Sequence, residues 1–137
     1  MTADLIQQPQ IWQLLMEAGP AGLAAVAFSP YENHSMIFEE LRYGDEEDGL
    51  RGLENVIYDN SWLLSDFSKV RMLYDTLRVL PVPDTDDDAA CDIFRRVYSA
   101  QEFPGSQVVV NHIPEQDMAI CWEIPGDVLN FIRRTFP

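Results

Sequence analysis

The first third of the chain alternates apolar runs with turns in a way that predicts three strands. Residues 11–17 suit a strand or a helix by composition, and residues 23–28 are entirely apolar. Gly and Pro within residues 18–22 predict a turn between them, and two apolar runs around such a turn are typical of a hairpin. Residues 36–43 form a third run with weaker alternation. We therefore expect an antiparallel meander of three strands.

A helix is predicted after this meander. Apolar residues recur at the spacing of one helix face, at Leu50, Leu53, Val56 and Ile57. Four consecutive acids at 45–48 precede it, where the positive end of the helix dipole favours negative charge. A metal site at these acids is the alternative, but the dipole explains them more simply. The helix is expected to end near residues 59–61, with residues 62–64 packed behind it.

A fourth strand and a second helix follow. Residues 69–75 alternate in part, and the prolines within residues 76–83 keep that stretch extended. Thr85 followed by Asp88 matches a capping box, which predicts a helix start. The expected apolar face of this helix is Ala90, Ile93, Phe94, Val97 and Tyr98.

The acids at this helix start also resemble part of a calcium-binding loop. Asp84, Asp86 and Asp88 have the alternate spacing of the first ligands in such a loop. The loop then requires Gly where this chain has Ala89, and Glu where it has Arg95. We therefore reject a calcium loop.

The last third of the chain predicts a hairpin and a final helix. Residues 107–113 and 118–124 are apolar runs on either side of a turn at 114–117. Residues 128–134 then have a short apolar face of Val128, Leu129 and Ile132. The order is β-β-β-α-β-α-β-β-α. We expect an α/β fold with a mixed sheet, formed as a single domain by residues 1–137.

This order and three segments resemble a known fold. The order contains the β-β-β-α-β-α-β core of the ribonuclease H-like fold, on which actin-like proteins are built. Residues 33–38 (NHSMIF), 62–70 (WLLSDFSKV) and 75–83 (DTLRVLPVP) are similar to an uncharacterised bacterial family with an actin-like ATPase fold. Such proteins have two related halves, so the resemblance implies a first half only. It implies a fold rather than a reaction, because that family has no established activity.

The same resemblance implies a nucleotide site at the first hairpin turn. Actin-like ATPases use glycines there for close approach to phosphates, and an acid to orient a magnesium-bound water. Glu17, Gly19 and Gly22 are the candidate residues for Mg-ATP. The chain departs from the pattern, because Glu replaces the usual Asp, Pro20 removes an N–H donor, and the turn lacks Lys, Ser and Thr. We favour a plain hairpin turn.

A nuclease of the ribonuclease H type would need convergent carboxylates that hold two metal ions. The topology offers Glu17, on the first hairpin, and Asp75, at the end of the fourth strand, as candidate metal ligands. Few basic residues are present to bind a nucleic acid, so we do not expect this activity.

The composition narrows the choice of partners. The chain has 23 acidic and 9 basic residues and a net charge of −14 at pH 7. Nucleic acid is not an expected partner, because phosphate binding needs Lys and Arg. The acidity favours a solvated surface, and an acidic docking face for a basic protein is the alternative. No apolar run reaches the roughly 20 residues of a membrane helix, and no signal peptide is evident, so we expect a cytoplasmic protein.

Histidine and cysteine form no catalytic motif in the sequence. His34 falls in a predicted loop and His112 on a predicted strand, where we expect a hydrogen-bonded side chain. Cys91 and Cys121 give no disulfide framework or metal spacing, so we expect reduced, buried thiols. The tryptophans are expected to be core or hairpin residues: Trp12, Trp62 and Trp122.

Together these observations predict a non-enzymatic, acidic domain of actin-like fold that acts through protein contacts and needs no cofactor. Its expected interface is an exposed sheet edge or the face that would meet a second half. The partner would be an unidentified protein, a second homologous half-domain, or a second copy in a homodimer. The alternative is a degenerate ATPase-like domain that binds Mg-ATP at residues 17–22. Whether the natural chain continues past Pro137 is open.

Overall fold

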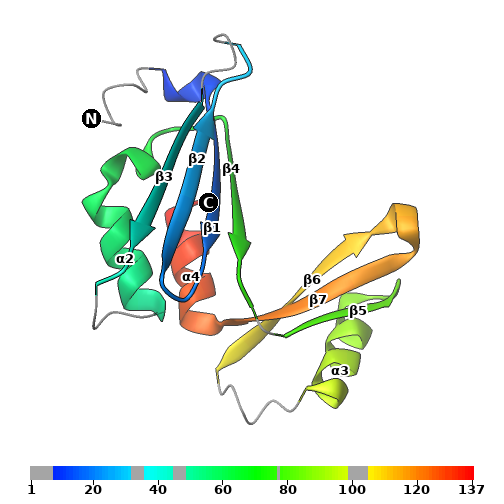
Figure 1. The fold of residues 1–137 in the computed structure, drawn as a ribbon. Coiled ribbons are helices and arrows are strands. Elements are labelled where there is room, and N and C mark those ends of the chain that lie inside the picture. The colour runs from blue at the N-terminus through cyan, green and yellow to red at the C-terminus, as the bar shows by residue number, and fades with distance from the viewer. Residues whose placement is uncertain (1–7, 32–35, 45–48, 77, 99–104) are drawn as a thin grey trace. The chain divides into compact units, whose positions relative to one another are not determined.

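The computed structural model describes residues 8–31, 36–44, 49–76, 78–98 and 105–137. His34 and the acids at 45–48 therefore lie outside the described residues. The chain divides into two compact units, Met1–Asp75 with Arg134–Pro137 and Thr76–Arg133, and each contains its own sheet (Figure 1). The single domain expected over residues 1–137 stays a prediction.

The first unit is built on a four-stranded sheet with the order β3-β2-β1-β4, which we call sheet A. β1 (Gln13–Ala18), β2 (Gly22–Phe28) and β3 (Met36–Arg42) form the predicted antiparallel meander. β4 (Lys69–Tyr74) is added beside β1 in parallel. Short 3-10 helices precede β1 and β4, and an α-helix follows β3: η1 (Pro9–Ile11), η2 (Ser61–Leu64) and α2 (Gly49–Asp59).

One face of sheet A forms the core of this unit, because side chains of a strand alternate between its two faces. The buried positions of β1 and β2 are Leu14, Met16, Ala18, Leu23, Ala25 and Ala27. α2 packs against β2 and buries three of its four predicted apolar residues, Leu53, Val56 and Ile57. Trp62 and Leu63 of η2 are also buried, as predicted, but Leu64, which was expected to pack with them, is 41% exposed.

The second unit is built on a three-stranded antiparallel sheet with the order β5-β7-β6, which we call sheet B. Its strands are β5 (Val79–Pro83), β6 (Ser106–Ile113) and β7 (Met118–Pro125), and the 3-10 helix η4 (Pro114–Gln116) joins β6 to β7. α3 (Asp87–Val97) packs on one face over a core of Val82, Ala90, Phe94, Ala119 and Cys121. α4 (Gly126–Thr135) follows β7 and begins two residues earlier than predicted.

The element order differs from the prediction at residues 76–83. The sequence predicts that this stretch continues the fourth strand, but it contains a separate strand, β5, which pairs with β7. Pro81 and Pro83 suit this position because β5 is an edge strand, where missing N–H donors cost no ladder bonds. The predicted α/β class with a mixed sheet is confirmed, with one strand more than expected.

The predicted start of α3 was wrong by one residue. The N-cap is Asp86 rather than Thr85, and its Oδ1 accepts a hydrogen bond from the Ala89 N–H at 2.8 Å. The chain offers several cap-forming residues in a row, and aspartate caps at least as well as threonine.

The apolar face of α3 is narrower than predicted. Ala90 and Phe94 are buried, but Ile93 and Val97 are exposed by 37% and 58%. Tyr98 is the C-cap, half-buried against the Phe94 ring. The buried stripe is narrow because α3 covers one small sheet, so its flanks face solvent.

Candidate functional site

The residues singled out for nucleotide and metal binding meet at one open pocket of the first unit. Glu17, Gly19 and Gly22 line it together with Asp75, and its volume is about 340 Å³. Asp75 reaches this pocket because β4 runs parallel to β1, so both strands end at the same edge of sheet A. The Asp75 N–H donates to the Ala18 carbonyl oxygen at 2.9 Å, which fixes the two strand ends together.

The backbone of the turn is poor in donors for a phosphate. The Gly19 N–H already donates to the Gly22 carbonyl oxygen at 2.9 Å, and Pro20 has no N–H. A Cβ on Gly22 would lie 2.5 Å from the Leu41 carbonyl oxygen, so the close approach of β2 and β3 requires glycine there. This close approach explains why position 22 is glycine, and no bound ligand is needed to explain it. The nucleotide role of Glu17, Gly19 and Gly22 stays a prediction.

The pocket carries more negative than positive charge. Glu17, Glu40 and Asp75 line it, with Arg42 as the opposing cation. The carboxylates repel a bare phosphate, so a nucleotide would have to enter with a divalent cation. Within the described ranges, no group of three or more His, Cys, Asp or Glu residues could hold a metal ion. The metal role of Glu17 and Asp75 stays a prediction.

The second face of sheet A is largely apolar and accessible, and we call it the open face. Strand register places its side chains in three rows across β3, β2, β1 and β4: Met36-Phe28-Gln13-Lys69, Phe38-Val26-Leu15-Arg71 and Glu40-Ala24-Glu17-Leu73. Met36 is 68% exposed, and Phe38 and Leu73 are each 55% exposed. Met36 and Phe38 are neighbours on the edge strand β3, whereas Leu73 lies on the opposite edge strand β4. Exposed apolar side chains grouped on one face are typical of interaction surfaces.

The open face does not share the acidity of the chain. Lys69 and Arg71 lie on β4, at one side of the apolar centre, and Arg42 lies one step beyond the third row. Glu17 and Glu40 lie in the third row. Asp75 likewise lies one step beyond Leu73 on β4, so three of the nine basic residues are on this face against three carboxylates, in a chain with a net charge of −14.

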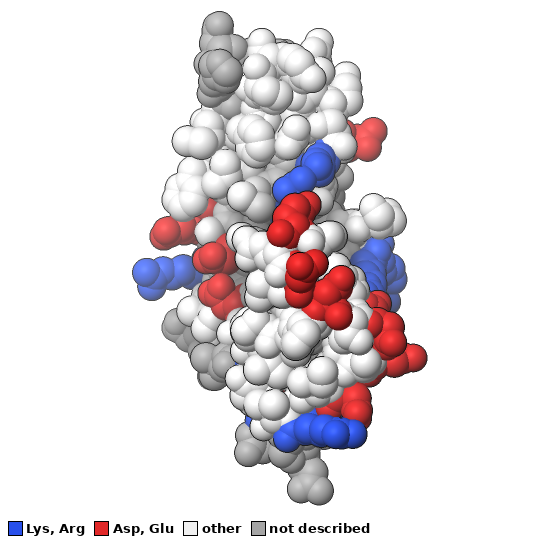
Figure 2. Space-filling view, turned by 90° about the vertical axis from the view of Figure 1, so that its right-hand side faces the viewer, with Lys and Arg blue, Asp and Glu red and all other residues white. Residues whose placement is uncertain are grey.

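Elsewhere the surface is acidic. Asp and Glu predominate over Lys and Arg on the side of the molecule that Figure 2 shows. Asp92 and Arg96 of α3 form an ion pair at 3.0 Å, but both are exposed, so the pair contributes little to stability. No helix in the described part of the chain is long and apolar enough to cross a membrane. The cytoplasmic location stays a prediction.

Sheet B also has a face turned away from α3. Register places Val79, Trp122 and Val109 in one row of this face and Pro81, Ile120 and Asn111 in the next. These two rows contain no charged residue, so they carry no charge pattern that would select a partner.

A buried ion pair lies at one end of sheet B. Arg78 Nη1 is 3.5 Å from Glu123 Oε2, and the two side chains are 10% and 6% exposed. The Ser106 hydroxyl donates to the other carboxylate oxygen of Glu123. The Arg78 guanidinium also lies 5.4 Å from the centre of the Tyr98 ring, at cation–π distance. This cluster joins the ends of all three strands of sheet B.

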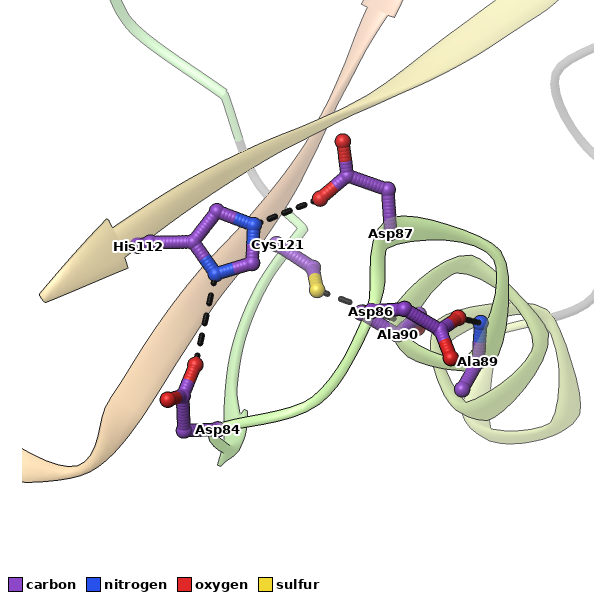
Figure 3. A network of polar contacts seen from close by, with 7 residues as sticks. All are labelled: Asp84, Asp86, Asp87, Ala89, Ala90, His112 and Cys121. Carbon is purple, nitrogen blue, oxygen red and sulfur yellow. Dashed lines mark hydrogen bonds and ion pairs between the residues drawn. The ribbon is translucent and has the colours of Figure 1, made fainter. Parts of the chain in front are cut away.

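His112 joins β6 to the start of α3 (Figure 3). Its Nε2 lies 2.5 Å from Asp87 Oδ1, and its Nδ1 lies 3.4 Å from Asp84 Oδ1. The hydrogen bond to Asp87, with a smaller contribution from Asp84, raises the pKa of His112 above its ordinary value of 6.5. The predicted hydrogen-bonded role of this residue is confirmed.

We expect this contact to make the stability of the second unit depend on pH. A folded-state pKa above the unfolded value means that the imidazolium stabilises the fold. The contribution of the His112 imidazolium to stability is fully present below about pH 6.5. It is lost as the pH rises through the raised pKa of the folded state. Urea unfolding should show a loss of stability as the pH rises above about 6.5, and this loss should be smaller in His112→Gln. An equal loss in both proteins would contradict the role of His112.

The surroundings of the two cysteines disfavour the reactive thiolate form. Cys121 is buried and Cys91 is half-buried, and neither forms a disulfide. Burial raises the pKa of both thiols, and the thiolate is the reactive form. The prediction of buried thiols is therefore confirmed for Cys121, whereas Cys91 is only half-buried.

The open face and the buried ion pair were not predicted from the sequence. The open face did have a signal, the weak alternation of residues 36–43. Alternation is weak there because Met36 and Phe38 are apolar on the exposed face while Ile37 and Leu41 are apolar on the half-buried face. The pairing of Arg78 with Glu123 had no local signal, because 44 positions separate them and only the β5–β7 pairing brings them together.

Comparison with known proteins shows the fold. The chain is similar to a Bacteroides thetaiotaomicron protein with an actin-like ATPase fold and unknown function, at a TM-score of 0.82 and 16% sequence identity. The match covers 94% of this chain and 50% of that chain, so this chain spans half the length of that protein. No family model and no curated protein matches. The actin-like fold implied by the three segments is confirmed.

Proposed function

We propose that this actin-like domain is a non-enzymatic protein-interaction module, and that it binds another protein through the open face of sheet A. The observation that carries the proposal is the exposure of Met36, Phe38 and Leu73 on one sheet face. Large apolar side chains left in water forgo about 1.5–3 kcal/mol each relative to burial, so covering this face stabilises a complex.

The charge pattern supports the same surface. An apolar centre bordered by Lys69 and Arg71 on one side and by Glu17 and Glu40 at one end has the composition of an interface with a polar rim. One sheet edge supports it less well, because the edge strand β5 contains two prolines, which cannot donate to an added strand.

Hydroxyl-radical footprinting tests this proposal. Met36 and Phe38 should be labelled rapidly in the dilute purified protein and protected in a concentrated extract of the cells that make it. Tyr58 on α2 is the matched control, because it is 57% exposed, much like Phe38. Its labelling should not change. Equal labelling of Met36 and Phe38 in both samples would refute the proposal.

The second candidate function is Mg-ATP binding at the turn pocket, favoured by the convergence of Glu17, Gly19 and Asp75 there. We expect calorimetric titration with Mg-ATP to give no saturable heat, because the turn is poor in donors and the pocket is acidic. Saturable binding that both Glu17→Ala and Gly19→Val abolish would instead support a working phosphate site.

A further inference from the structure

We infer that the partner on the open face of sheet A is a second copy of this chain, packed face to face about a two-fold axis parallel to the strands. This inference rests on the proposed function and adds the identity of the partner. Two sheets that pack in this way lie about 10 Å apart with their strands nearly aligned. A two-fold axis makes the same surface serve on both copies, so each contact occurs twice.

The register of sheet A determines what such an axis brings together. An axis that passes between β1 and β2 lays β1 of one copy over β2 of the other, and β4 over β3. Each row then faces the same row of the second copy. At the centre, Leu15 faces Val26 of the second copy, and both are half-buried apolar side chains with room for further burial.

The charges of the open face are complementary in this arrangement. Arg71 on β4 faces Phe38 of the second copy, which suits cation–π packing. Glu40 of the second copy lies two residues further along β3, about 7 Å from Phe38 along the strand. A guanidinium can span that step, so Arg71 pairs with Glu40 of the other copy, twice per dimer.

The other in-plane axis is disfavoured by the same pattern. An axis perpendicular to the strands at the second row would lay each strand over itself and place Arg71 against Arg71 of the second copy. Like charges in contact oppose association, so this perpendicular axis is disfavoured relative to the axis parallel to the strands. The net charge of −14 on each copy does not prevent contact, because distant carboxylates are screened beyond about 8 Å at physiological ionic strength.

Sedimentation equilibrium of the full chain over a range of concentrations tests this inference. The mass should rise from 15.7 kDa toward twice that value. Arg71→Glu and Glu40→Arg should each weaken the dimer by about tenfold or more, because each places like charges together. The double variant R71E/E40R should restore dimerisation. Arg51→Glu, an exposed change on α2, is the control and should leave the dimer unchanged.

Circular dichroism of each variant checks that the fold is retained, since all three positions are exposed. A monomer at every concentration would overturn the inference, as would a dimer that Arg71→Glu leaves intact or that the double variant fails to restore. Protection of Met36 and Phe38 in cell extract would then still support the proposed function, with a different protein as partner.

Discussion

Glu123→Ala should destabilise the second unit by about 3–5 kcal/mol, the largest effect of any single change considered for this chain. The substitution removes the carboxylate that faces Arg78 at 3.5 Å and accepts from Ser106, and both sites are shielded from water. A buried guanidinium left without that partner keeps its desolvation cost. Since whole domains are stable by only about 5–15 kcal/mol, this loss is a large fraction of the total, and we expect urea denaturation to show a clearly lower unfolding midpoint.

Two further variants separate the buried charge from a general effect of mutation. Glu115→Ala removes an exposed carboxylate from the same unit and should change stability by no more than about 0.5 kcal/mol. Replacing both partners, as Arg78→Met with Glu123→Leu, should recover most of the lost stability, because no unpaired charge remains. If Glu123→Ala behaved like Glu115→Ala, the ion pair would not be a determinant of stability.

Gly22→Ala should destabilise sheet A by about 1–3 kcal/mol or more, whereas Gly19→Ala should be tolerated. The added Cβ at Gly22 would lie 2.5 Å from the Leu41 carbonyl oxygen, which is backbone and cannot move without separating β2 from β3. At Gly19 the nearest atom is Asp75 Oδ2 at 3.1 Å, which a side-chain rotation can withdraw. Chemical denaturation followed by circular dichroism measures the change in stability of both variants.

This pair of variants also distinguishes the two explanations of the turn. The chemical change is the same and the positions are three residues apart, so only the surroundings differ. A structural turn predicts a large effect at Gly22 and a small one at Gly19. Equal effects on stability would show that the clash with Leu41 does not control the site.

The sequence predicted the elements of sheet A well because their signals are local. The turn residues at 18–22 and the apolar run at 23–28 define the hairpin without any distant information, and both strands of the hairpin are confirmed. The capping acids likewise predicted α3 to within one residue. The resemblance of residues 33–38, 62–70 and 75–83 pointed to the actin-like fold that the structural comparison shows.

The division into two sheets could not be predicted, because it depends on which strands pair. Residues 76–83 are extended in either arrangement, and nothing local shows that β5 joins β7 rather than sheet A. The open face could not be predicted for the same reason, because it too depends on strand pairing. Phe38 is an ordinary strand residue in the sequence, and only the register places it beside Val26 on a face where it is 55% exposed.

The central claim is that the open face of sheet A is covered by another protein chain in the working state. Photo-cross-linking in the cells that make the protein tests it most directly, with a photoreactive phenylalanine at position 38 or, as control, at position 58. These side chains are 55% and 57% exposed, so accessibility alone favours neither. We expect a covalent protein adduct from position 38 and none from position 58. No adduct at position 38, or equal adducts from both positions, would contradict the claim.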